Sequence, residues 1–298
     1  MEHAVSVRRL PPRSIVIAVV LLAGALAAWI VTVERMRGMD AGPGTDLGGL
    51  GWYVGIWVTM MAAMMLPSAA PMVLLFSRVS RERQRRGQAF VPTWVFLVGY
   101  LAVWTAYGLA TYGLYRGVRA AGTGFLAWDR AGPYVVGAAV AAAGIYELTP
   151  LKSVCLKHCR SPMHYVLGGW REGKLGALRM GVEHGGYCLG CCWGLMIVLF
   201  ALGVMSLFWM ALVAGVIFLQ KLAPRAERYT PAVAVVLVGL GIWVAAAPGS
   251  VPGLTQPNSQ AAQRARDRMM HMSPSPGMHE QPGMKQPAME KPGSQMKP

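Results

Sequence analysis

Long apolar stretches alternate with short polar or basic segments along most of this chain. A stretch of about 20 apolar residues can cross the hydrocarbon core of a bilayer as a helix. The uncharged stretch over 188–220 is too long for one crossing, so we divide it near Gly203. The pattern predicts an all-α, polytopic membrane helix bundle of about seven transmembrane helices, at 14–33, 51–76, 92–114, 131–150, 183–201, 204–222 and 231–247.

The first apolar stretch follows Arg8, Arg9 and Arg13, a pattern shared by signal peptides and first transmembrane helices. It is longer than a usual signal-peptide core, and no small-residue cleavage motif precedes Glu34. We therefore expect a retained helix.

The composition changes at Gly249, after which branched aliphatic and aromatic residues nearly vanish. Such a segment cannot bury enough apolar surface to fold alone. We therefore predict two parts, a transmembrane domain over 1–248 and a disordered Met/His/Pro-rich tail over 249–298. The tail's thioethers and imidazoles suggest an auxiliary metal-capture arm, with candidate ligands Met269, Met270, His271, Met272, Met278, His279 and Met284. A low-complexity tail without a ligand role is the alternative.

Composition and charge agree with a membrane protein. The chain is 54% hydrophobic and only 14% charged, which excludes an ordinary soluble domain. Its formal charge of +15 would suggest nucleic acid in a soluble protein, but the basic residues lie mainly in short loops. The positive-inside rule then predicts a multi-pass protein of the bacterial inner (cell) membrane, with a cytoplasmic N-terminus and the tail outside. We expect the lipid bilayer, and no nucleic acid, as a partner.

The first candidate metal-binding group follows the fourth predicted helix and comprises Cys155, His158, Cys159 and His164. Thiolate and imidazole suit copper(I) or zinc, and a spacing of three or four residues places side chains on one helix face. The alternative is two ordinary cysteines, kept reduced by the cytosol.

The second group opens the fifth predicted helix and comprises His184, Cys188, Cys191 and Cys192. Cys188 and Cys191 form a C-x-x-C pair, and a helix N-terminus would favour the thiolate form. Both groups should lie at the inner membrane face, so we predict that they form one metal site. Close helix packing at the neighbouring glycines is the alternative.

Two further features could relay metal through the membrane. Met60, Met61, Met64 and Met65 form i, i+4 pairs on the second predicted helix, and thioethers bind copper(I) without losing a proton. They could equally fill gaps near the prolines of that helix. Glu147 is an ionisable residue near the end of a membrane helix, which makes it a functional candidate.

The motifs resemble a family of predicted metal-binding integral membrane proteins, catalogued as domain of unknown function 2182. The resemblance covers roughly residues 52–222 and rests on Met64-Met65-Leu66-Pro67, on Tyr146 to Lys152 running into Cys155 to Arg160, and on His184 to Met196. Gln220 departs from the pattern, which has Glu before the Lys. The resemblance implies metal binding and leaves the metal and its direction of movement open.

These features together predict a non-enzymatic soft-metal protein that transports or delivers its cargo. A copper ion is the expected metal and zinc the second choice, with affinity for copper(I) rising from Met and His outside to Cys and His inside. Its partners would be the metal ion and a copper-dependent membrane enzyme or metallochaperone. Two alternatives stay open: a membrane thiol-disulfide oxidoreductase, and an accessory subunit that loads copper into a partner enzyme.

Overall fold

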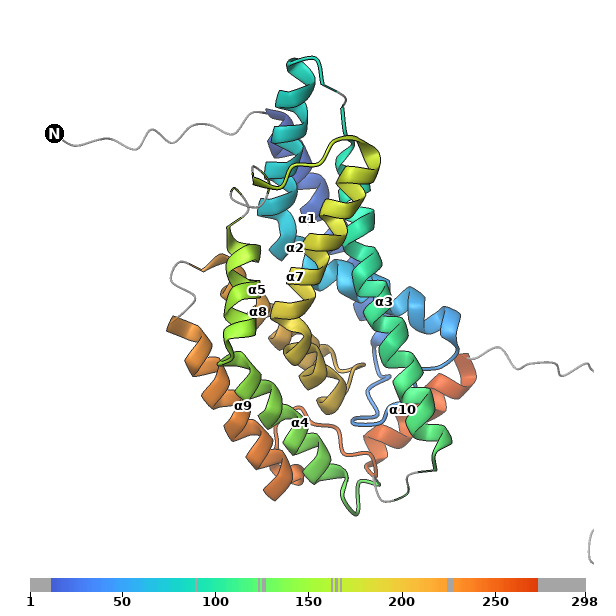
Figure 1. Cartoon of the computed structure of the whole chain (residues 1–298). Coiled ribbons are helices and arrows are strands. Elements are labelled where there is room, and N and C mark those ends of the chain that lie inside the picture. Colours follow the sequence, from blue (N-terminus) through green and yellow to red (C-terminus); the bar gives the residue numbers. More distant parts are fainter. Residues whose placement is uncertain are drawn as a thin grey trace, which may run out of the picture.

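The structure, a computed structural model, describes residues 12–88, 90–122, 124, 127–161, 163, 166, 168–223 and 228–272. Over these ranges it contains helices and no strand, which confirms the all-α bundle (Figure 1). The principal helices are α1 (Pro12–Met36), α2 (Leu50–Arg85), α3 (Thr93–Ala120), α4 (Gly132–Glu147), α5 (Pro150–Arg160), α7 (Gly173–Leu202), α8 (Leu207–Leu222), α9 (Tyr229–Ala246) and α10 (Gln260–Met272), with a short 3-10 turn at Pro248–Ser250.

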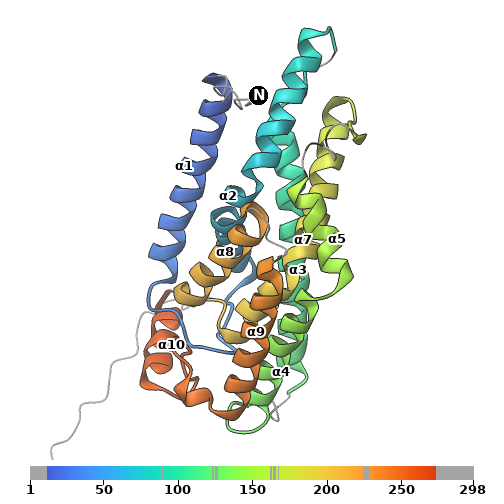
Figure 2. The ribbon, with the colours of Figure 1, turned by 90° about the vertical axis from the view of Figure 1, so that its left-hand side faces the viewer.

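Among the described residues, five helices are long and apolar enough to cross a membrane, namely α1, α2, α3, α7 and α9. The bent pair α4 and α5 makes a sixth crossing if it is counted as one span, and α8 is a shorter apolar helix of 16 residues. The prediction of seven spans therefore depends on α8. The start of α1 and helix α10 lie at opposite ends of the bundle (Figure 2).

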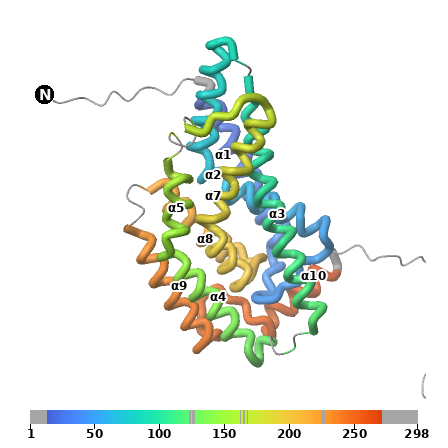
Figure 3. The backbone as a smooth tube through the Cα atoms, viewed as in Figure 1, coloured from blue at the N-terminus to red at the C-terminus, as the bar shows by residue number. Residues whose placement is uncertain are grey.

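The fourth predicted helix is broken, and the expected loop after Pro150 is helical. Helices α4 and α5 meet at an angle of 64°. Pro150 disfavours the helical conformation of Thr149 and lacks an N–H, so α4 ends before it. Thr149 then caps α5 by accepting a hydrogen bond from the backbone N–H of Lys152. The bend lets α5 lie beside α7 and α8 (Figure 3).

Glycines allow the long helices to approach closely. Gly99 of α3 faces the Leu178 carbonyl of α7, and Gly181 of α7 faces the Phe96 carbonyl of α3, at distances that leave no room for a Cβ atom. Gly137 and Gly241 do the same between α4 and α9. Small residues at such crossings are how membrane helices pack in the absence of a hydrophobic driving force.

The expected disordered tail does not begin at Gly249. Residues up to Met272 are described, and the segment after α9 packs on the bundle. The Trp209 indole donates to the Gly253 carbonyl (3.0 Å), and the Thr255 hydroxyl donates to Asp40 (3.0 Å). In α10, Ala262 and Ala265 pack against Ala41, and Met269 is partly buried beside them. Met278, His279 and Met284 lie outside the described residues.

Candidate metal centre

Four cysteines from two helices come together, and we call them the sulfur cluster: Cys159 of α5 and Cys188, Cys191 and Cys192 of α7. The Sγ atoms of Cys159 and Cys191 are 3.8 Å apart, and those of Cys191 and Cys192 are 3.3 Å apart. Cys188 interacts with the thiols of the other three. The structure thus joins the two predicted cysteine groups, although their positions are 32 residues apart in the chain.

A lysine and a tyrosine complete the surroundings of Cys188. The Lys221 ammonium of α8 donates to the Cys188 sulfur at 2.9 Å, and the Tyr100 hydroxyl of α3 lies 3.0 Å from the same atom. Lys221 also reaches the Ser68 hydroxyl of α2 at 3.5 Å. All four residues are buried. A buried ammonium against a sulfur stabilises the thiolate form, because the two charges compensate each other.

Cys155 lies on the same helix as Cys159, and its contact with α7 is at Gly190. Its sulfur packs against Gly190 of α7, where even a Cβ atom would collide with it. Tyr146 donates from its hydroxyl to the Gly190 carbonyl and fixes the same stretch of α7. A residue larger than glycine would not fit at position 190, because α5 and α7 cross there.

The two described histidines of the predicted ligand set stack on aromatic rings. His158 stacks on Tyr187 with ring centroids 4.2 Å apart, and its Nδ1 pairs with the Val154 carbonyl (2.9 Å). His184 is buried and stacks on Phe96 and Tyr100. His164 lies outside the described residues. The contacts within the sulfur cluster thus join sulfur to sulfur, while both described histidines stack on aromatic rings.

The position of the sulfur cluster along its helix differs from the prediction. Helix α7 begins at Gly173, not near Glu183, so Cys188 lies 15 residues into the helix. Its N-terminal N–H groups are about 20 Å away at 1.5 Å per residue and cannot favour a thiolate there. Lys221 supplies the positive charge instead, and the three cysteines of α7 lie within that helix rather than at its start.

The methionines of α2 lie in the same apolar core as the sulfur cluster. Met60, Met61, Met64 and Met65 are all buried there, together with Met196 and Met210. The contact between Lys221 and Ser68 places Ser68 at the level of Cys188. Met64 and Met65 precede Ser68 by about one helical turn, roughly 5 Å along the axis. Met64 and Met65 therefore lie about one helical turn from the level of Cys188.

Glu147 is bound by a lysine and an amide. Its carboxylate accepts from the Lys152 ammonium and from the Gln220 amide (2.6 Å), and Lys152 also donates to the Gln220 carbonyl oxygen (2.8 Å). All three side chains are buried. Because both carboxylate oxygens have partners, this triad fastens α4, α5 and α8 together and leaves Glu147 poorly placed as a metal relay.

In the described part of the chain, no three His, Cys, Asp or Glu side chains are arranged as a finished metal site. Lys221 and Tyr100 contact the Cys188 sulfur, and the Cys191 thiol donates to the Cys188 carbonyl (3.1 Å). A metal must displace thiol protons and rotate side chains before the sulfurs can act as ligands.

Lys221 and Tyr100 are absent from the candidate site residues predicted from sequence. A usable signal existed for Lys221, which is the first charged residue after the uncharged stretch 188–220 and ends a membrane helix. Tyr100 had no such signal, because it is one aromatic residue among many in α3. Only the crossing of α3 with α7 brings it to Cys188.

A family model described as "PpoB2: Copper chaperone" matches residues 54–244, which include the sulfur cluster, Lys221 and the four methionines of α2. The corresponding comparisons find no match among curated proteins and none among solved structures. The match agrees with the metal-binding family expected from the sequence motifs. It does not confirm the name domain of unknown function 2182.

Proposed function

Because the chain belongs to the PpoB2 copper chaperone family, we propose that it binds copper(I) within the membrane through its sulfur cluster and delivers the ion to a copper-dependent partner. The observation that carries this proposal is the meeting of Cys159 with Cys191 across two helices. Soft thiolates prefer copper(I), and the match to a copper chaperone family favours copper over zinc.

The spacing of the sulfurs supports a shared metal. Two sulfurs bound to one ion through bonds of about 2.3 Å lie at most about 4.6 Å apart. The separations of 3.8 Å and 3.3 Å fall within this limit. Cys159 and Cys191 come from different helices, so the bound ion would also link α5 to α7.

The charge of the site supports a monovalent ion. Copper(I) held by two thiolates carries one net negative charge, and the Lys221 ammonium next to Cys188 can compensate it. Zinc prefers four ligands in a tetrahedron, often with histidine, whereas His158 and His184 both stack on aromatic rings.

A route for the ion follows the methionines of α2. Met60, Met61, Met64 and Met65 would pass copper(I) by exchange between neutral thioethers, which need no proton transfer. We place the methionine side of the core outside and the basic end of α2 in the cytoplasm. Copper(I) would then move inwards towards stronger thiolate ligands, and the Met/His-rich tail would raise its local concentration.

An anaerobic copper(I) titration of the purified full-length protein, in competition with a chromophoric chelator, tests the proposal. The variants Cys159→Ser and Cys191→Ser should weaken copper(I) binding by at least about tenfold, which corresponds to about 1.4 kcal/mol for a lost ligand. Cys155→Ser is the matched control, since its sulfur packs against Gly190. It should retain most of the affinity.

Two results would overturn the proposal. The first is an equal affinity for copper(I) in the wild type and in the Cys191→Ser variant. The second is copper-independent turnover of the cysteines between thiol and disulfide, measured by counting free thiols before and after a quinone is added. That second result would instead support the membrane thiol oxidoreductase.

A further inference from the structure

A groove of about 900 Å³ lies between α8 and α9, and residues of α7 also line it. We call it the α8–α9 groove; Figure 2 shows these two helices side by side. It extends from Tyr229 at the start of α9 to Trp243 near its end, roughly 21 Å along the helix. One leaflet contributes about 15 Å of the hydrocarbon core. The groove is therefore long enough to hold the tail of a lipid from one leaflet.

The wall of the α8–α9 groove offers almost only hydrocarbon. The indoles of Trp209 and Trp243 line it, and their N–H groups donate to other parts of the chain, at 3.0 Å and 2.8 Å. The Gln220 amide is held by the triad with Glu147. A ligand with polar groups along its length would leave them unpaired here, so the groove fits a hydrocarbon chain. Its aliphatic lining includes Leu195, Leu212, Val216, Val236 and Leu240.

Positive charge gathers at the end of the groove where α8 ends and α9 begins. The Arg160 guanidinium of α5 donates to the Ala223 carbonyl at 2.8 Å, and Ala223 lines the groove. A guanidinium has five N–H donors, so this bond leaves others for an anion. Arg228 is exposed and directly precedes Tyr229, which also lines the groove. The connecting segment 223–228 has two arginines and one glutamate, so with Arg160 this end is cationic.

We propose that the α8–α9 groove binds an anionic phospholipid, with an acyl chain along the two helices and the phosphate beside Arg160 and Arg228. Guanidinium groups form strong paired hydrogen bonds with phosphate oxygens. Basic pockets between membrane helices on the cytoplasmic side are typical places for anionic head groups, and the predicted topology puts this connection inside. A transmembrane helix of another protein would fill the groove without using the two guanidinium groups, so a lipid accounts for more of the site.

The lipid site lies next to helices that carry the sulfur cluster and its lysine. The hydrogen bond from Arg160 to Ala223 joins the end of α5 to the end of α8. Arg160 directly follows Cys159 in the chain, and Ala223 lies just after Lys221. A phosphate bound here would therefore hold together two helix ends near the metal centre. The site itself needs no copper, so it stands independently of the proposed function.

Native mass spectrometry of the full-length protein tests the head-group end of the site. The protein is titrated in detergent with dioleoyl-phosphatidylglycerol or with dioleoyl-phosphatidylcholine, which has the same tails and no net charge. The wild type should bind phosphatidylglycerol about tenfold more tightly, and the double variant Arg160→Gln and Arg228→Gln should lose this preference. The control Arg116→Gln and Arg264→Gln removes two exposed arginines of other helices and should keep it.

A second pair of variants tests the groove. Gly239 lines it, and a Cβ atom there would meet nothing within 4 Å. Gly239→Leu should therefore fill the groove without a clash and weaken the binding of both lipids by about tenfold. Gly215→Leu, on α8 with equally open space and outside the groove lining, should leave binding unchanged.

Three results would refute the lipid site. The first is equal affinity of the wild type for the two lipids, and the second is equal lipid binding by Gly239→Leu and Gly215→Leu. The third is a dimer in the native spectrum that Gly239→Leu dissociates and Gly215→Leu does not. That result would assign the groove to a second copy of the chain.

Discussion

At the scale of single residues, the pairing of Lys221 with Cys188 distinguishes this centre from a simple group of cysteines. The ammonium is buried and donates to a sulfur at 2.9 Å. Buried charges in a membrane are costly unless each has a partner. The pair therefore keeps a thiolate available in an apolar core, and it gives the site a fixed positive charge before metal arrives.

The variant Lys221→Met should weaken copper(I) binding by about tenfold or more, because a copper dithiolate would then leave an uncompensated negative charge in the core. Lys221→Arg should restore part of the affinity. Competition with a chromophoric copper(I) chelator measures the effect. Lys157→Met is the control, since Lys157 is exposed on α5. Equal copper(I) affinity in Lys221→Met and the wild type would rule out this role.

Glu147 shows the limit of judging a buried ionisable residue by its type alone. The sequence identifies it as a relay candidate, because a carboxylate near the end of a membrane helix often has a function. In the structure its partners are Lys152 and Gln220, from two other helices. Gln220, which departs from the expected Glu, donates to Glu147 here. A second carboxylate at that position would lose this hydrogen bond.

At the scale of helices, close crossings determine where the sulfurs lie. Tyr100 reaches Cys188 because α3 and α7 touch at Gly99 and Gly181. Likewise, the bend at Thr149 and Pro150 brings Cys159 to Cys191. The geometry of the sulfur cluster is therefore a property of helix packing as much as of the cysteines.

The variant Gly99→Val should destabilise the protein by about 1–3 kcal/mol or more, because its side chain would meet the α7 backbone at Leu178. Separating α3 from α7 should also weaken copper(I) binding, through loss of the Tyr100 contact. Thermal unfolding in detergent and a copper(I) titration measure the two effects. Gly113→Val, on the same helix with open space around it, should cost far less. Similar unfolding temperatures for the two variants would show that the crossing can adjust.

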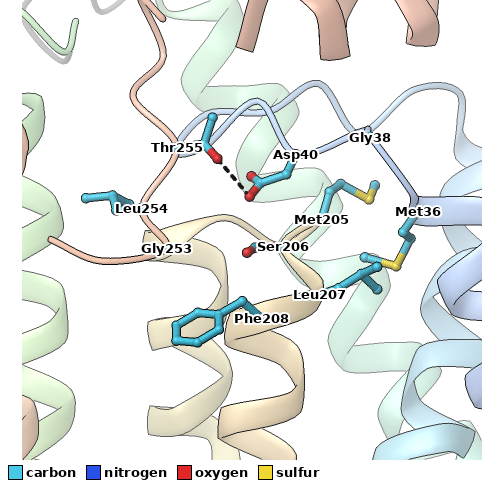
Figure 4. A pocket seen from close by; sticks show the side chains of 10 residues that line it. All are labelled: Met36, Gly38, Asp40, Met205, Ser206, Leu207, Phe208, Gly253, Leu254 and Thr255. Atoms are coloured by element: carbon cyan, nitrogen blue, oxygen red, sulfur yellow. Dashed lines mark hydrogen bonds between the residues drawn. The ribbon is translucent and has the colours of Figure 1, made fainter. Parts of the chain in front are cut away.

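At the scale of the whole molecule, the two ends of the bundle carry different chemistry. The basic residues of the C-terminal part of α2 lie at one end, and helix α10 lies at the other (Figure 2). A pocket lined by Met36, Asp40 and Met205 is formed where α1 ends and α7 turns into α8 (Figure 4). The sulfur cluster lies between the two ends. This polarity makes membrane orientation the property that decides the direction in which copper would move.

Single-cysteine labelling tests the orientation, in a background with the five native cysteines replaced by serine. Gln84→Cys reports the basic end of α2, and Asn258→Cys reports the end near α10; both positions are exposed. An impermeant maleimide should label position 258 in intact cells and position 84 only after lysis, because basic segments stay in the cytoplasm. Protection of position 258 in intact cells would mean that the chain is inverted, or that α8 does not cross the membrane.

The sequence by itself determined the fold class and most helix positions, because apolar periodicity and length reflect the bilayer directly. The break at Gly203 was predictable from the length of the uncharged stretch, and the structure ends α7 there. The cysteine residues of the site were also evident, since few other residue types serve soft-metal chemistry. These features depend on local composition, which can be read directly from the sequence.

Only the tertiary structure decided which cysteines meet and which polar groups accompany them. Cys159 meets Cys191 whereas Cys155 packs on Gly190, and both contacts depend on how α5 packs against α7. Tyr100 and Lys221 come from helices far apart in the sequence. Helix α10 holds residues that look disordered by composition, because alanines and Met269 find apolar partners on the bundle. Contacts between distant segments depend on crossing geometry, which local sequence patterns do not encode.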